Sequence, residues 1–226
     1  DTNITINNSK NTGEIILNIG QYSKAPNAAG ILADTLAYTI IKSSNNEGNV
    51  YGGGYLNISY AGIVANVQED ILIDNCKNKG QITSQGSNDI AAGILGKIIV
   101  QDTIADITNC ENTGDITATT VAAGILGQAG GDEFRIKDSS SNNCKIQATL
   151  ATAGIVGVSS TDTHISNCRT ENLTLNANSG STAAILALEV PVNYTLGEVG
   201  NIYNYTASPS LIDIKNISVK NKKVGF

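Results

Sequence analysis

The chain has no tryptophan or methionine, and its 226 residues include only three prolines, two phenylalanines and one histidine. Because aromatic residues make up 4% of the chain, a hydrophobic core has to be built mainly from Ile, Leu, Val and Ala. Ile and Val are β-branched and favour strands over helices. With one histidine and no Cys-x-x-Cys spacing, the sequence offers too few ligands for a zinc-type metal site.

Positive charge is also scarce, since 14 Lys and Arg residues oppose 20 Asp and Glu residues and the net charge is -6. Nucleic acid binding needs clustered basic side chains, and the only cluster is the terminal set Lys220, Lys222 and Lys223. No apolar run approaches the roughly 20 residues of a membrane-spanning helix. We therefore expect neither a nucleic acid partner nor a transmembrane segment. The sequence lacks an N-terminal Met and a signal peptide, so we expect a processed or excised piece of a longer protein.

A short motif of small and aliphatic residues recurs along the chain at a nearly constant interval. Its clearest copy, residues 121–127, reads Val-Ala-Ala-Gly-Ile-Leu-Gly. The central residues of the six copies are Gly30, Gly62, Gly93, Gly124, Gly154 and Ala184, which gives steps of 32, 31, 31, 30 and 30 residues. A period this regular is typical of an architecture in which each repeat buries its apolar face against the next.

Two further segments recur with this motif. An alternating run such as residues 71–76 comes before an Asn-x-Gly turn such as residues 78–80, and a shorter alternating run follows it. Three short strands in about 31 residues fit one coil of a parallel β-helix, and crossovers between parallel strands are right-handed. The sequence therefore predicts an all-β, right-handed parallel β-helix of six to seven coils with three strands per coil. We expect the repeat array to span 1–190 and residues 191–226 to form a degenerate last coil or a C-terminal cap of the same domain.

The repeat resembles the GLUG-type repeats of large bacterial surface proteins. The resemblance covers roughly residues 1–190 and rests on these residues and their equivalents in the other repeats: Gly93, Ile94, Leu95, Gly96, Asn109, Cys110, Asn112 and Gly114. It implies an extracellular or cell-surface location, in an adhesin or in a non-catalytic part of a surface-anchored enzyme.

Three of the four cysteines follow an asparagine at the end of the same predicted strand. We expect them to form a structural ladder along the β-helix, made of Cys76, Cys110, Cys168, Asn75, Asn109 and Asn167. Neighbouring coils lie about 4.8 Å apart, which is within the Cα range of a disulfide, but parallel side chains make its dihedral unfavourable. The favoured interpretation is a row of buried, apolar thiols. A disulfide between Cys76 and Cys110 is the alternative.

Acidic residues gather in the variable turn after the repeat motif or at the start of the next strand: Asp102, Asp106, Asp132, Glu133 and Asp162. A pair of carboxylates would serve glycoside hydrolysis, and a cluster of carboxylate oxygens would hold a structural calcium ion. A lyase acting on acidic sugars would need a row of basic side chains, and the sequence has only a few nearby. His164 has no Gly-x-Ser-x-Gly motif to accompany it. We therefore expect no enzymatic activity and no cofactor, with calcium as the open alternative.

Tyrosine is the one aromatic residue present in number, and three tyrosines cluster in the second repeat. The candidate ligand-binding residues are Tyr51, Tyr55, Tyr60, Asp132 and Glu133. Exposed tyrosines beside Asn and Gly suit contacts with glycan or protein. The expected function is a non-catalytic adhesin or rigid spacer that binds a host or environmental glycan or a surface protein. The alternatives are a polysaccharide hydrolase or lyase that uses turn carboxylates, and a filament subunit that stacks end to end through its exposed strand edges.

Overall fold

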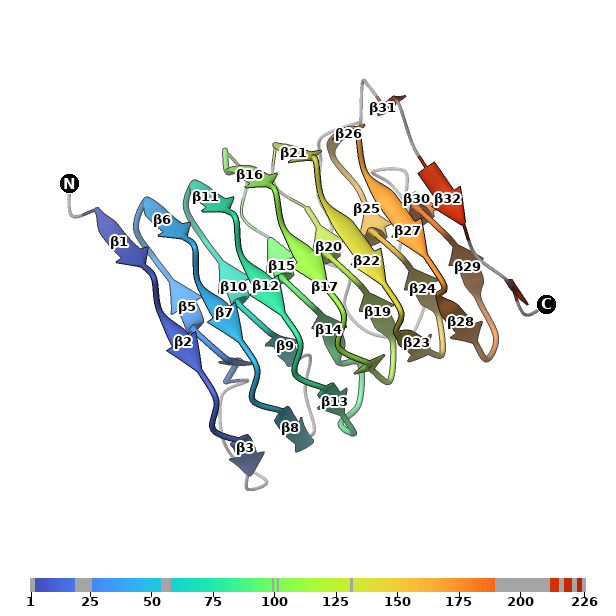
Figure 1. Ribbon diagram of the computed structural model, residues 1–226, viewed down its shortest axis with the longest axis horizontal. Helices are drawn as coiled ribbons and strands as arrows, with labels where there is room; N and C mark the ends of the chain where they lie inside the picture. Colours follow the sequence, from blue (N-terminus) through green and yellow to red (C-terminus); the bar gives the residue numbers. More distant parts are fainter. Residues whose placement is uncertain are drawn as a thin grey trace.

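The chain forms a parallel β-helix in a computed structural model (Figure 1). The structure describes residues 3–18, 26–53, 58–98, 100, 102–130, 132–189, 212–215, 218–220 and 223–224, with side chains as far as residue 187. Every regular element in this part of the chain is a strand. The backbone descends the front of the molecule in Figure 1 and returns up its back as it moves from the N-terminal to the C-terminal end. This path is right-handed, so the predicted fold is confirmed.

Six coils of five strands follow one another, and three strands of a seventh coil continue the stack. The first coil contains β1 (Ile4–Asn7), β2 (Lys10–Asn11), β3 (Ile15–Asn18), β4 (Ala28–Ala29) and β5 (Leu32–Thr35). The second contains β6 (Thr39–Lys42), β7 (Asn45–Asn46), β8 (Val50–Gly53), β9 (Ser59–Ala61) and β10 (Val64–Val67). The third contains β11 (Ile71–Asp74), β12 (Lys77–Asn78), β13 (Ile82–Ser84), β14 (Ile90–Ala92) and β15 (Leu95–Ile98).

The later coils repeat this order. The fourth contains β16 (Ile104–Thr108), β17 (Glu111–Asn112), β18 (Ile116–Thr117), β19 (Val121–Ala123) and β20 (Leu126–Ala129). The fifth contains β21 (Glu133–Lys137), β22 (Ser140–Asn142), β23 (Lys145–Ala148), β24 (Ala151–Ala153) and β25 (Val156–Ser159). The sixth contains β26 (Asp162–Ser166), β27 (Arg169–Glu171), β28 (Thr174–Ala177), β29 (Ser181–Ala183) and β30 (Leu186–Glu189). The last strands are β31 (Ile212–Lys215), β32 (Ser218–Lys220) and β33 (Lys223–Val224).

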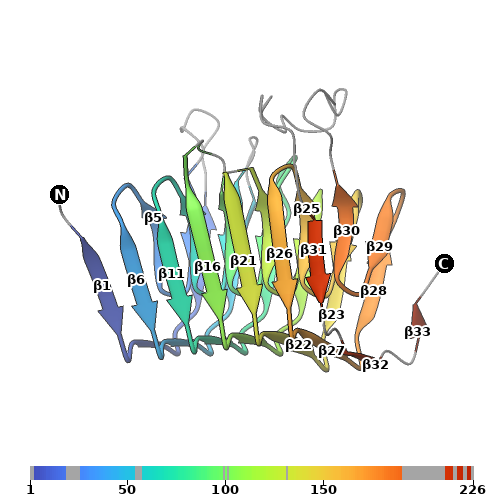
Figure 2. The same cartoon turned by 90° about the horizontal axis from the view of Figure 1, so that it is seen from above.

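Equivalent strands of successive coils pair in parallel and form five sheets, which we name A to E after the order of the strands within a coil. Sheet A runs from β1 to β31 and faces the viewer in Figure 2. Sheet B runs from β2 to β32, sheet C from β3 to β33, sheet D from β4 to β29 and sheet E from β5 to β30. In-register pairing places residues of one repeat position in a straight row, so the repeat period in the sequence becomes the coil period in space.

The prediction of three strands per coil is wrong, because the structure has five. The Ala-Gly-Ile-Leu motif does not form one strand. It bends after its glycine, as at Gly93, and contributes one short strand to sheet D and one to sheet E. The segment expected to be only a turn also pairs between coils, as the two-residue strands β12 and β17 show. Its asparagines point into the molecule, and their stacking holds this segment extended.

The core consists of two main apolar clusters. The larger one lies between sheets A and E and includes a row of isoleucines in sheet A: Ile41, Ile73, Ile107, Ile136 and Ile165. The second lies between sheets C and D and includes Val50, Ile82, Ile116, Ile146 and Leu175. Both rows alternate with outward-facing residues along each strand, so a strand presents one face to the core and the other to solvent.

A column of asparagines crosses the interior at sheet B. Its members are Asn11, Asn46, Asn78 and Asn112, and the last three are fully buried. The carboxamide Nδ2 of each of the first three donates to the Oδ1 of the next asparagine at 2.8 Å, and that of Asn112 donates to the Sγ of Cys144 at 3.5 Å. Each of these nitrogens also donates to a glycine carbonyl two residues along the chain, at 2.8 to 3.0 Å. Both N–H groups of every buried amide in the column are therefore hydrogen-bonded.

The repeat glycines leave room for this column. A Cβ placed on Gly30, Gly62 or Gly93 would overlap the carboxamide of the asparagine in the following coil and the backbone carbonyl oxygen of the next repeat glycine. In the fifth coil Ser141 replaces the asparagine, and in the sixth coil Thr170 does so. The repeat glycines of the preceding coils, Gly124 and Gly154, approach these smaller side chains just as closely. The repeat glycine is therefore a packing requirement.

Replacing a repeat glycine is expected to destabilise the fold. Gly93→Ala should lower the free energy of unfolding by about 1 to 3 kcal/mol, because the added Cβ overlaps the Asn112 carboxamide and the Gly124 backbone. Gly13→Ala is the control, since a Cβ there meets only Asn11 Oδ1, at 3.8 Å. Urea unfolding followed by circular dichroism measures both. Equal losses in the two variants would contradict this account of the glycines.

Removing one member of the asparagine column is expected to cost more than removing a surface amide. Asn78→Ala leaves the Asn46 Nδ2 and the Asn112 Oδ1 each without one buried partner, so we expect a loss of about 3 kcal/mol. Asn49→Ala is the control, because that carboxamide accepts one bond from the Gln81 backbone at the surface. The same unfolding experiment measures both, and an Asn78→Ala loss below that of the control would refute the role of the column.

Candidate ligand-binding groove

An open hollow of about 430 Å³ lies on the outer face of sheet C, where β3, β8 and β13 are neighbours. These strands lie at the lower left in Figure 1. The residues that line it are Ile16, Asn18, Tyr51, Gly52, Gly53, Thr83 and Gln85. Pairing in register places Ile16, Tyr51 and Thr83 side by side on the outside, because their neighbours Ile15, Val50 and Ile82 point toward the core.

The second coil departs from the repeat at this site. Gly52 and Gly53 follow Tyr51 directly, so no side chain fills the space beside the tyrosine ring. Only glycine fits at position 52, because a Cβ there would lie 2.8 Å from the ring of the buried Tyr60 and 2.8 Å from the carbonyl oxygen of Leu17. The buried Tyr60 therefore supports the floor of the groove from inside the core.

The groove offers apolar surface and hydrogen-bonding groups but no charged side chain. Ile16 is a large hydrophobic residue that is 58% exposed, and it lies next to the half-buried Tyr51. Asn18 and Gln85 add amide groups, and none of the lining residues is acidic or basic. An aromatic face flanked by amides provides stacking and hydrogen bonds to a ligand that carries hydroxyl groups.

The structure places the predicted ligand-binding tyrosines in different environments. Tyr51 lines the groove. Tyr60 does not reach the surface, because its exposed fraction is 0%, so its assignment as a ligand-binding residue is wrong. Tyr60 pairs with Ala91 in sheet D and packs in the core cluster between sheets C and D. Tyr55 lies outside the described residues.

The predicted acidic candidates are not near this groove. Glu133 begins β21 in sheet A, where it lies 3.7 Å from Arg135 and 3.4 Å from the Nε2 of His164. Asp132 immediately precedes that strand and is exposed. The start of β21 in sheet A and the strand β8 in sheet C lie at opposite edges of the ribbon in Figure 1. Asp132 and Glu133 therefore do not belong to the groove, and their assignment as ligand-binding residues stays a prediction.

The other carboxylates of the turns do not converge on a groove either. Asp106 forms two hydrogen bonds with the Arg135 guanidinium, one of them between Nη2 and Oδ2 at 2.8 Å, on the outer face of sheet A. This hydrogen-bonded pairing raises the pKa of Arg135 above its ordinary value. Asp102 lies in a turn with φ of 58°, and Asp162 begins β26. Among the described residues no group of three His, Cys, Asp or Glu side chains is arranged to hold a metal ion, and structural calcium stays a prediction.

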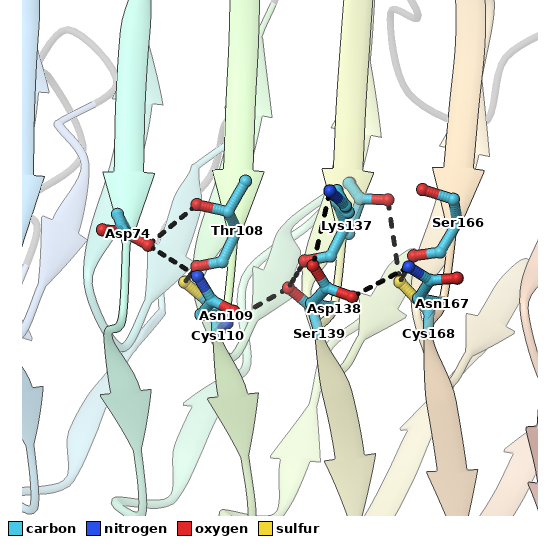
Figure 3. Close-up of polar contacts among 11 residues, drawn as sticks. Asp74, Thr108, Asn109, Cys110, Lys137, Asp138, Ser139, Ser166, Asn167 and Cys168 are labelled. Carbon is cyan, nitrogen blue, oxygen red and sulfur yellow. Dashed lines mark hydrogen bonds and ion pairs between the residues drawn. The ribbon is translucent and has the colours of Figure 1, made fainter.

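Three of the cysteines occupy the corner between sheets A and B, as Figure 3 shows for Cys110 and Cys168, whereas Cys144 lies between β22 of sheet B and β23 of sheet C. Cys76, Cys110 and Cys168 are buried, and each thiol donates to the carbonyl two residues earlier in the chain, at 3.2 to 3.4 Å. All four cysteines, Cys144 included, are free in the structure, which therefore does not contain the Cys76–Cys110 disulfide considered from the sequence. Burial raises the pKa of Cys168 to about 11, so this thiol stays protonated at neutral pH.

The asparagine before each of these cysteines turns the chain at the same corner. Asn75, Asn109 and Asn167 have φ values of 53°, 52° and 53°, a left-handed conformation that asparagine tolerates. Their side chains stay outside and reach back to the preceding coil, as Figure 3 shows for the bonds of Asn109 to Asp74 and of Asn167 to Asp138, each 3.0 Å long. They form an external set of contacts between coils, distinct from the buried column.

Comparisons with protein-family models, with curated proteins and with solved structures find no match to this chain. No helix in the described part of the chain is long and apolar enough to cross a membrane. The GLUG-type resemblance, the surface location and end-to-end association therefore stay predictions. Function has to be argued from the geometry of the groove.

Because Tyr60 is buried and its hydroxyl has no hydrogen-bond partner, Tyr60→Phe is expected to change stability at neutral pH by less than about 1 kcal/mol. Burial, together with the negative charge of Asp89, raises the pKa of Tyr60. The folded state therefore keeps this proton at pH values where the unfolded state, with a tyrosine pKa near 10, loses it. The stability that the raised pKa confers is lost as the pH rises above about 10.

Unfolding in urea at pH 8 and above pH 10 measures this loss. Tyr60→Phe should lose less free energy of unfolding between the two pH values than the unmodified chain. Tyr38→Phe, which removes a phenol that is 40% exposed, is the control. A pH dependence that is unchanged in Tyr60→Phe would show that this tyrosine is not buried as described.

Proposed function

We propose that this chain is a non-catalytic β-helix module that binds carbohydrate in the groove around Tyr51. The proposal is carried by one observation: an open hollow in which a tyrosine ring, an exposed isoleucine and two amides meet without any charged side chain. Sugar rings present an apolar face that stacks on an aromatic ring, and their hydroxyl groups pair with amides. The β-helix serves as the rigid support, in an adhesin or spacer exposed outside the cell.

The composition of the groove supports binding without catalysis. Hydrolysis of a glycosidic bond uses a pair of carboxyl groups placed on either side of the bond. None of the residues that line the groove carries a carboxyl group. The acidic side chains considered from the sequence belong to sheet A or its adjoining turns, as described for Asp106 and Glu133. A bound glycan is therefore expected to be released unchanged.

Truncating the groove tyrosine tests the proposal. Tyr51→Ala is expected to weaken binding of a glycan identified by an array screen about tenfold or more, because the lost stacking is worth about 1 to 2 kcal/mol. Tyr38→Ala is the matched control, since it removes another partly exposed tyrosine from outside the groove. Calorimetric titration measures both affinities, and an assay for new reducing ends tests for cleavage.

Equal affinity in Tyr51→Ala and the unmodified chain would place the binding surface elsewhere. New reducing ends or unsaturated products would overturn the non-catalytic assignment and direct attention to Asp102, Asp106, Asp132 and Asp162. An array on which no glycan binds would leave the module without the proposed ligand and reject the proposal.

A further inference from the structure

The groove is one end of a longer row of outward-facing residues. Register pairing in sheet C aligns one residue from each of six coils: Ile16, Tyr51, Thr83, Thr117, Gln147 and Asn176. All six are half-buried or exposed. We call this set the neutral row. With coils about 4.8 Å apart, the neutral row is about 24 Å long, which extends well beyond the groove around Tyr51.

The neutral row carries hydroxyl and amide groups but no charged side chain. Thr83, Thr117, Gln147 and Asn176 follow the tyrosine in sequence along the axis. The adjoining positions at the start of the same strands do carry charge, as at Asp115 and Lys145. The row and the groove, which has no charged lining residue, are therefore neutral although charged residues adjoin them.

The outer faces of sheets A and B carry charged side chains instead. The equivalent row of sheet A contains Asp106, Arg135 and His164, and the outward row of sheet B contains Lys77, Glu111 and Arg169. These rows are crossed by ion pairs, such as the one between Lys77 and Glu111 at 3.1 Å. An extended ligand that followed either of them would have to displace ion pairs, whereas a ligand on the neutral row displaces only water.

We propose that the ligand is a neutral, linear polysaccharide that lies along the β-helix axis and crosses the strands of sheet C. One sugar stacks on Tyr51 in the groove, and the following sugars donate hydrogen bonds to, and accept them from, Thr117, Gln147 and Asn176. An anionic polymer finds no basic side chain in the neutral row and meets a chain of net charge -6. This inference rests on the proposed carbohydrate-binding function and adds the class and the orientation of the ligand.

A length series of oligosaccharides tests the orientation. The probes are di-, tetra- and octasaccharides of neutral glucan, mannan, xylan and galactan, with oligogalacturonates of the same lengths as the anionic series. For the neutral series that binds, affinity should rise at least about tenfold from the disaccharide to the octasaccharide, because each added hydrogen bond contributes a factor of a few. Binding should also be insensitive to salt, since no ion pair forms with a neutral ligand.

A charge placed in the neutral row, away from the groove, is the sharpest variant. Gln147→Glu should weaken octasaccharide binding about fivefold or more while leaving the disaccharide affinity unchanged, because Gln147 lies three coils from Tyr51. Ser166→Glu is the matched control, since it adds the same charge on the outward face of sheet A. Circular dichroism of each variant checks that the fold is retained.

The outcomes separate this inference from the proposed function. Equal affinity for all neutral lengths, or no effect of Gln147→Glu on the octasaccharide, would overturn the axial orientation. The proposed function would still stand if Tyr51→Ala weakened binding. Tighter, salt-dependent binding of oligogalacturonate would overturn the neutral class. If Tyr51→Ala changed no affinity at all, the proposed function itself would fail, and the inference with it.

Discussion

The contact between a buried asparagine and the repeat glycine of the preceding coil is the constraint on which the rest of this structure depends. The carboxamides of Asn46, Asn78 and Asn112 fill the interior at sheet B, and only a residue without a Cβ can approach them from the other side. This close approach bends the chain at each glycine and divides the main core between two clusters. It also sets the axial register, because a slip between coils would leave several buried amides without partners.

The groove arises where one coil departs from this regular scheme. Tyr60 stands in the row where its neighbours are Ala28 and Ala91, so the second coil has to accommodate a large ring inside. It does so at Gly52, whose missing side chain provides the space. The next residue, Gly53, adds no side chain on the outer face of β8, which leaves Tyr51 with an open side. Two adjacent glycines thus face opposite sides of β8, Gly52 the core and Gly53 the groove, while the register of the surrounding coils is kept.

The period of the repeat predicted the coil, the parallel stacking and the rows of inward aliphatic residues, because these depend only on which positions recur. It did not predict that the asparagine of Asn-x-Gly points inward, since that residue is equally suited to a turn at the surface. The burial of Tyr60 was also missed, although its alignment with Ala91 and Ala122 marks an inward position. Glu133 and Tyr51 were grouped by residue type, but the first begins a strand of sheet A and the second lies in sheet C. The groove residues Ile16, Asn18, Thr83 and Gln85 become visible only once the register between coils is known.

Rigidity links this architecture to the proposed role. In a β-helix each strand is held on both sides by its neighbours, so outward side chains such as Tyr51 and Gln147 keep their spacing before any ligand arrives. A binding surface organised in advance loses little conformational entropy on association, and shallow contacts repeated along the axis can then add up to useful affinity. The ion pairs on sheets A and B are exposed and contribute little to stability. The stability of the fold therefore comes mainly from its core. Along the neutral row, sheet C presents hydroxyl and amide groups without charge, which suits the hydroxyl-rich ligand proposed for it.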